Sequence, residues 1–261
     1  MVASNRGDGD LGGTRPFVVF VSSVTPAGIV YGPLLGEIAQ EVRPELKELE
    51  VLAGDAPPPD YAFDAEVEGI RRVAEEAGQQ SVHLVGFSAG ASAALAFAAK
   101  YPEHAASLAL VEPPFIGNGF RTPEEEAFWA EGDEAMAKPP AERMGAFLRM
   151  LLRPGVQPPA RPEGPPPPWM LKQPAALGAL HRSFESHDLD LGSLRDFRKP
   201  VYVAVGSLSN PAWERMAERL GAALPNVEVE FYEGRHHLDA PHAAEPERFA
   251  RALRKLWTQT A

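Results

Sequence analysis

The stretch VHLVGFSAGASAA, residues 82–94, decides the fold of this chain. Its apolar start predicts a buried strand, and its alanine-rich end predicts a helix. Between them lies Gly86-Phe87-Ser88-Ala89-Gly90, which has the form G-x-S-x-G. Glycines permit a sharp turn from strand to helix, and such a turn lifts the serine hydroxyl above the end of the strand. The segment therefore predicts a nucleophilic Ser88, with a serine in an ordinary tight turn as the alternative.

Strands and helices alternate on both sides of this segment. Apolar and β-branched runs predict further strands at 16–21, 46–54, 106–113, 200–206 and 227–234. Helical spacing of apolar residues predicts helices between them, one stopped by Pro44 and another closed by Gly78. This order is typical of an α/β fold, in which a mostly parallel central sheet is flanked by helices.

The alternation breaks at residues 114–198, where no convincing strand is found. Thr122 and Glu125 predict a capping box, with Pro123 at the first helical position. A second amphipathic helix is indicated by Met144, Phe147, Leu148 and Leu151. The proline-rich run at 162–169 predicts an extended polyproline segment. We therefore predict the following organisation: a flexible tail at 1–15, a core domain at 16–113 and 199–261, and a helical cap at 114–198.

Composition narrows the classes of function. The chain has 261 residues, no cysteine and a formal net charge of -11. The missing cysteines exclude disulfides, thiolate zinc sites and a cysteine nucleophile, and the acidic balance argues against nucleic-acid binding. No segment approaches the ~18 apolar residues of a membrane span, and the N-terminal residues do not resemble a secretory signal. We expect a cytoplasmic protein whose partner is a small-molecule substrate, with a homodimer as a candidate assembly.

The longer stretch VHLVGFSAGASAALAFAAKYPEHAASLALVEP, residues 82–113, resembles a segment of the α/β-hydrolase superfamily in its cap-bearing, single-domain form. The resemblance extends over about residues 16–257. It implies the α/β-hydrolase fold, Ser88 as nucleophile, a histidine base and an acid. It also implies a helical cap inserted after the strand that follows the serine. No cofactor and no metal are expected.

The loop after the last predicted strand reads EGRHHLDAPH, residues 233–242. In the resembled family this loop carries the base in a pattern similar to G-x-G-H, which places His237 at the catalytic position. His236 remains the alternative, because a loop alignment slips easily by one residue, and His242 lies close to the final helix. The imidazole would take the proton from Ser88 during attack. The other histidines are expected to be packed or solvated: His83, His104, His181 and His187.

The third member of the triad departs from the commonest family pattern. The family most often carries an aspartate after the strand at 200–206, but the chain reads GSLSNP there, with Ser209 at the expected position. Some members carry the acid after the preceding strand, where this chain has Glu112. Asp239 is only two residues from His237, so its reach to the imidazole would be strained. The prediction is Glu112, with a locally paired glutamate as the alternative.

Backbone amides and aromatic side chains complete the predicted site. The amide of Ala89 and that of Ser23 or Val24 are expected to stabilise an oxyanion. Where the family often has His-Gly, the chain has Ser22-Ser23. The predicted substrate-binding residues are all aromatic: Phe87, Phe115, Trp129, Phe147 and Trp169. The alternative is that most of these side chains form the core of the cap itself.

These features predict a serine hydrolase of the carboxylesterase type. It would cleave an ester, thioester or lactone bond of a small, largely apolar substrate through an acyl-enzyme on Ser88. The alternatives are a non-hydrolytic lyase or cyclase on the same fold, or a ligand-binding pseudoenzyme, because the acid and oxyanion positions are altered. A serine-reactive probe distinguishes an enzyme from a pseudoenzyme.

Overall fold

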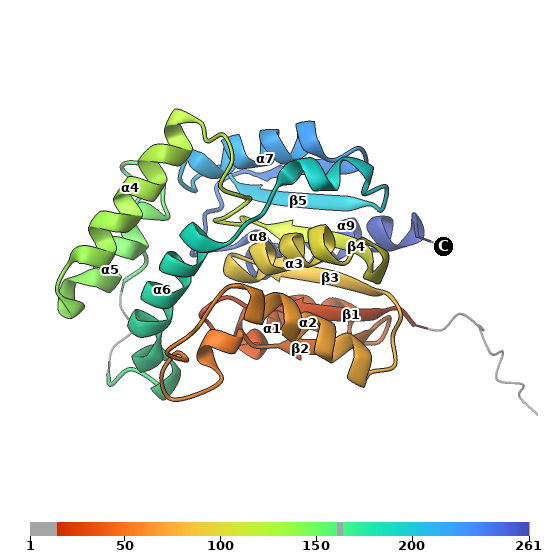
Figure 1. The fold of residues 1–261 in the computed structure, drawn as a ribbon, viewed down its shortest axis with the longest axis horizontal. Coiled ribbons are helices and arrows are strands. Elements are labelled where there is room, and N and C mark those ends of the chain that lie inside the picture. Colours follow the sequence, from red (N-terminus) through yellow and green to blue (C-terminus); the bar gives the residue numbers. More distant parts are fainter. Residues whose placement is uncertain (1–14, 161–163, 261) are drawn as a thin grey trace, which may run out of the picture.

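A computed structural model describes residues 15–160 and 164–260, and its centre is a six-stranded sheet of order β2-β1-β3-β4-β5-β6 (Figure 1). The strands are β1 (Phe17–Val21), β2 (Arg43–Lys47), β3 (Val82–Phe87), β4 (Ala105–Val111), β5 (Val201–Gly206) and β6 (Val227–Tyr232). Every neighbouring pair is parallel, so the predicted parallel α/β sheet is confirmed. The predicted tail at 1–15 lies, except for Arg15, outside the described residues.

Helices cover both faces of this sheet. One face packs against α1 (Ala27–Ile38), α8 (Pro241–Ala244) and α9 (Pro246–Thr258). The other packs against α2 (Asp64–Glu76), α3 (Ala89–Lys100) and α7 (Ala212–Ala223). Side chains of a strand point to alternate faces, so Val18 and Phe20 enter one core while Val19 and Val21 enter the other. This explains the unbroken apolar runs, which belong to strands buried on both sides.

The second strand differs from its prediction. We predicted a helix stopped by Pro44 and a strand at 46–54, whereas α1 ends at Ile38 and Pro44 lies inside β2. Residues Glu50–Leu52 form a short 3-10 helix, η1. The reason is that β2 is an edge strand, where a proline is tolerated because one side of the strand needs no amide donor.

The insertion between β4 and β5 is helical. It contains α4 (Pro123–Ala137), α5 (Pro140–Met150), α6 (Pro168–Ser186) and the 3-10 helix η3 (Leu191–Asp196). Figure 1 shows α4, α5 and α6 gathered at one end of the sheet. The capping box is confirmed, because Thr122 Oγ1 accepts from the Glu125 amide at 3.3 Å and Glu125 Oε2 accepts from the Thr122 amide at 2.7 Å. The predicted polyproline segment is partly outside the described residues, and its end forms the first turn of α6.

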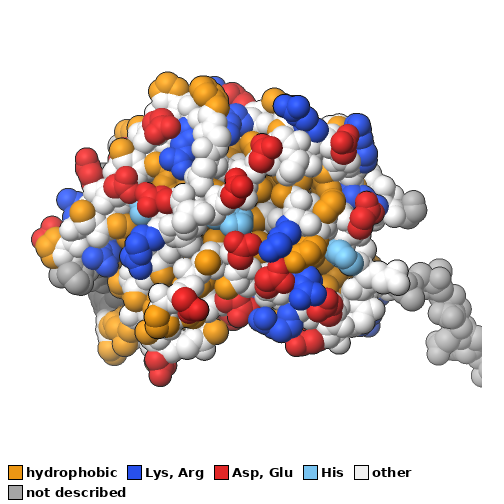
Figure 2. All heavy atoms as spheres, viewed as in Figure 1, with side chains coloured by type: hydrophobic (Ala, Val, Ile, Leu, Met, Phe, Trp, Pro, Cys, Tyr) orange, Lys and Arg blue, Asp and Glu red, His pale blue; other side chains and the backbone are white. Residues whose placement is uncertain are grey.

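The surface mixes charges of both signs. Figure 2 shows Asp and Glu side chains interspersed with Lys and Arg over the face that it presents. Among the described residues, no helix combines the length and the apolar character needed to cross a bilayer.

Candidate active site

Ser88 lies in the turn between β3 and α3. Its φ of 54° and ψ of -126° form a backbone conformation that residues other than glycine rarely adopt. The flanking glycines make this turn sterically feasible. A Cβ on Gly90 would lie 2.2 Å from the carbonyl oxygen of Val21, and one on Gly86 would lie 2.5 Å from Cα of Ala91. The packing of α3 against β1 and β3 therefore requires glycine at both positions, as the G-x-S-x-G pattern predicts.

A chain of hydrogen bonds joins Ser88 to two residues distant in sequence. His237 Nε2 lies 3.1 Å from Ser88 Oγ, and His237 Nδ1 lies 2.7 Å from Glu112 Oε2. An imidazole that donates from Nδ1 to a carboxylate presents a lone pair at Nε2. The group can therefore accept a proton from the serine hydroxyl. The structure brings together the three residues that the sequence singled out.

Glu112 follows β4 directly and is completely buried. Its φ of 48° turns the chain sharply at the end of the strand. Its Oε1 accepts from the amide of Gly206 at 2.7 Å and from the hydroxyl of Ser209, which leaves Oε2 for His237. Ser209, at the position where the family most often has its acid, thus contacts the glutamate that we predicted in its place. A buried carboxylate needs such partners, because an unpaired one would lose its hydration without compensation.

The neighbouring histidines are placed differently. His236 Nδ1 is buried and has no hydrogen-bond partner among the described residues, and the Asp239 carboxylate pairs with Arg235 rather than with His237. His242 is completely buried, and burial lowers its pKa to about 3, so it is neutral near pH 7. Of the histidines in this loop, only His237 hydrogen-bonds Ser88 within the part of the chain that the structure describes.

Two aromatic rings pack against the His237 imidazole. Trp213, in the first turn of α7, stacks on it with ring centroids 4.4 Å apart and an interplanar angle of 12°. Phe87 also packs against the imidazole, with ring centroids 4.8 Å apart and an interplanar angle of 33°. Trp213 could not be singled out from the sequence, because a tryptophan at the start of an amphipathic helix carries no signal beyond that of a core residue.

The residues whose amides are expected to face an oxyanion lie around the same cavity as Ser88. Ala89 is the first residue of α3, and the first amides of a helix have no partner inside the helix. Among the described residues, the amides of Ser23 and Val24 donate to no other backbone group. All three residues line the same cavity as Ser88. The carbonyl of Val24 accepts from Gln173 Nε2 at 3.2 Å, which ties this loop to α6.

A cavity of about 330 Å³ opens at Ser88, between the C-terminal ends of the strands and the inserted helices. Its lining is mainly apolar and includes Phe87, Trp129 and Phe147, which the sequence indicated. Phe115 does not line it, because it stacks on Phe184 at 5.1 Å within the core. Trp169, in the first turn of α6, does not line it either. The apolar wall also includes residues that the sequence did not indicate as cavity residues: Met136, Met144, Leu148, Leu151, Leu177 and Leu180.

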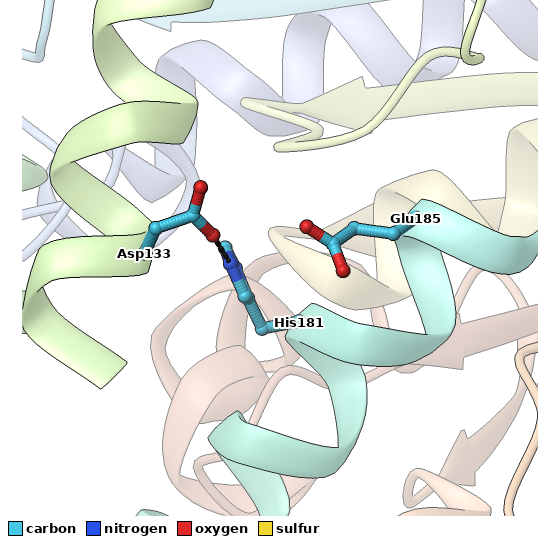
Figure 3. A group of neighbouring side chains, drawn as sticks. All are labelled: Asp133, His181 and Glu185. Carbon is cyan, nitrogen blue, oxygen red and sulfur yellow. Dashed lines mark hydrogen bonds and ion pairs between the residues drawn. The ribbon is translucent and has the colours of Figure 1, made fainter. Parts of the chain in front are cut away.

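Among the residues that the structure describes, one group of side chains has the spacing to hold a metal ion. Asp133 on α4 and His181 and Glu185 on α6 bring their ligand atoms within 4.8 Å of one another (Figure 3). His181 Nε2 already lies 2.6 Å from Asp133 Oδ1, so the imidazole is partnered without an ion. The sequence did not indicate this group, because its members come from two separate helices. His181 also lines the cavity, which places the pair at its edge.

Comparisons with known proteins identify similar chains. A family model described as "Alpha/beta hydrolase family" matches residues 18–252. A comparison with curated proteins finds no match. Solved structures with similar folds include a bacterial membrane phospholipase A, at 20% identity and a TM-score of 0.71 over 94% of this chain and 79% of that one. A thermophilic esterase from Thermogutta terrifontis is 19% identical, with a TM-score of 0.67 over 95% of this chain and 91% of that one. The enol-lactonase from Burkholderia xenovorans is 15% identical, with a TM-score of 0.66 over 96% of this chain and 94% of that one.

Proposed function

Because the chain belongs to the alpha/beta hydrolase family, we propose that it is a serine hydrolase which cleaves an ester, thioester or lactone bond through an acyl-enzyme on Ser88. The observation that carries the proposal is the hydrogen-bonded chain from Ser88 Oγ through His237 to Glu112. A buried carboxylate, an imidazole and a serine hydroxyl in this order form a catalytic triad suited to acyl transfer.

In the proposed first step, Ser88 Oγ attacks the carbonyl carbon of the substrate. His237 Nε2 takes the serine proton, and the electron pair of the carbonyl bond moves onto its oxygen. Glu112 keeps the imidazole in the tautomer that has its proton on Nδ1, and it balances the positive charge that develops on the ring. The strained turn at Ser88 holds Oγ above the sheet, so little reorganisation is required before attack.

In the proposed second step, the oxyanion collapses and the leaving group departs. The amides of Ala89 and of Ser23 or Val24 donate to the oxyanion, and removal of one such donor in a serine hydrolase costs about 10²–10³ in kcat. His237 returns its proton to the leaving oxygen or sulfur. Water then enters, gives a proton to His237 and attacks the carbonyl carbon of the acyl-enzyme. When this second oxyanion collapses, the bond to Ser88 Oγ breaks, His237 returns its proton to Oγ and the acid is released.

The lining of the cavity supports a small, largely apolar substrate. Aromatic and aliphatic side chains surround Ser88, and the inserted helices supply most of them. Burial of apolar substrate surface contributes about 25 cal/mol per Å². We propose that the insertion acts as a cap which excludes water from the acyl-enzyme. The structural similarity to an esterase and to an enol-lactonase supports this choice of bond.

A fluorophosphonate probe tests the proposal directly. The parent protein should be labelled on Ser88, as intact mass and peptide mapping would show, and Ser88→Ala should not be labelled. Hydrolysis of p-nitrophenyl esters of increasing chain length then measures the preference for the acyl group. A parent protein that neither reacts with the probe nor hydrolyses any ester would contradict the proposal and favour the ligand-binding alternative.

A further inference from the structure

We propose that Trp213 is a positioning residue for the base: its indole face stabilises the imidazolium form of His237 and holds Nε2 toward Ser88. This inference rests on the proposed function, because it assigns the means by which the same site forms and keeps its charged intermediate.

The two rings form a close parallel stack. Their centroids lie 4.4 Å apart at an interplanar angle of 12°, and Trp213 is only 1% exposed while His237 is 5% exposed. Water therefore cannot solvate the face of the imidazole that Trp213 covers. The negative face of an aromatic ring attracts a cation above it, and tryptophan provides the strongest such face. A proton gained by His237 is thus stabilised from the edge by Glu112 and from the face by Trp213.

The indole is anchored to the same segment as the acid. Trp213 Nε1 donates to the carbonyl of Pro113 at 3.1 Å, and Pro113 follows Glu112 directly. Asn210 accepts from the amide of Ala212 at 3.0 Å and so fixes the start of α7. The positions of the Glu112 carboxylate and the Trp213 indole are therefore fixed relative to each other. The hydrogen bond to the carboxylate and the stack on the indole together fix the orientation of the His237 imidazole.

The other groups around His237 are less suited to this stabilisation. Phe87 also contacts the imidazole, with ring centroids 4.8 Å apart, but its ring is tilted by 33° and a phenyl ring has a weaker negative face than an indole. Beyond it lies His242, whose pKa is lowered to about 3 by burial, so it adds no charge in the working pH range. Arg235 of the same loop pairs with Asp239 and Glu245. The charge on the imidazolium is thus balanced by the Glu112 carboxylate and further stabilised by the indole face of Trp213.

Substitutions at position 213 separate the electrostatic face from simple space filling. Trp213→Leu removes the aromatic face, whereas Trp213→Phe keeps a weaker one. We expect Trp213→Leu to lower kcat about fivefold with KM within twofold, and to move the midpoint of the rising limb of kcat/KM against pH down by about 0.5 unit. Trp213→Phe should recover most of both changes. Trp257→Leu, on α9 and away from the site, is the matched control and should leave the profile unchanged.

Fluorinated tryptophan placed at position 213 keeps the shape of the ring and weakens its negative face. The midpoint of the pH profile should then fall in steps as fluorine atoms are added, and this readout does not depend on how the leucine variant folds. An unshifted midpoint across the fluorinated series, or a phenylalanine variant as impaired as the leucine variant, would overturn the proposal. Labelling of the parent by a fluorophosphonate is measured alongside. A labelled parent with an unshifted series rejects only the role of Trp213, whereas an unlabelled parent rejects the hydrolase itself.

Discussion

Replacement of Glu112 by glutamine changes one buried oxygen into an amide nitrogen and leaves the size of the side chain almost unchanged. In the parent, Oε1 accepts from the Gly206 amide and from the Ser209 hydroxyl, while Oε2 accepts from His237 Nδ1. The glutamine oxygen must stay beside Gly206, since an NH₂ group there would face another donor. The NH₂ group is therefore directed at His237.

This arrangement reverses the tautomer of the imidazole. A donor opposite Nδ1 requires that Nδ1 accept, so the ring proton moves to Nε2, which faces Ser88 and can no longer take its proton. The amide also carries no charge to balance the imidazolium. By analogy with an amide at the acid of a Ser-His-Asp triad, kcat should fall by about 10⁴, equivalent to about 5.5 kcal/mol of transition-state stabilisation. KM should change little, because Glu112 does not line the cavity.

The assay is steady-state hydrolysis of a p-nitrophenyl ester, with thermal melting to show that the fold is kept. Nitrogen-15 NMR of the imidazole reports its tautomer independently of turnover. Glu76→Gln, at an exposed position on α2, is the matched control and should match the parent in all three measurements. If Glu112→Gln retained kcat within tenfold of the parent, or if Nδ1 of His237 remained protonated, Glu112 would not be the acid.

Five other substitutions test separate parts of the site. Ser88→Ala should abolish ester hydrolysis with a nearly unchanged melting temperature, and residual turnover in a clean preparation would reject the nucleophile. His237→Ala should lower kcat on the order of 10⁴ or more, and His236→Ala should cost far less; the reverse order would shift the base by one residue. Ser209→Ala should lower the free energy of unfolding in urea by about 2 kcal/mol, because a buried carboxylate loses a donor; an unchanged value would show that the bond is not needed. His242 has its folded pKa lowered to about 3, below an unfolded value of about 6.5, so its contribution to stability is present above pH 6.5 and is lost as pH falls toward 3. His242→Phe should therefore reduce the slope of unfolding free energy against pH by about 1.4 kcal/mol per unit between pH 6 and 4, and an equal slope would contradict its burial as a neutral ring.

Local patterns in the sequence predicted the elements that depend on near neighbours. The turn at Ser88 follows from glycines two residues away on each side, and the capping box follows from Thr122 and Glu125, three residues apart. The parallel sheet follows from the alternation of apolar runs with helices. Where position within the sheet mattered, local reasoning was wrong: Pro44 was predicted to stop a helix, yet it lies in β2 because that strand is at the edge.

The site depends on contacts that no local pattern contains. Glu112 and His237 are 125 positions apart, and the resemblance alone proposed that they meet. The structure supplied the hydrogen bond from Ser209 to Glu112, the stacking of Trp213 on His237 and the exclusion of Phe115 and Trp169 from the cavity. The sequence determined which residues can do chemistry, because backbone turns and caps are stabilised within a few residues. Only tertiary packing decided which of them face one another, because ring stacking and burial depend on strands and helices that the chain brings together from distant positions.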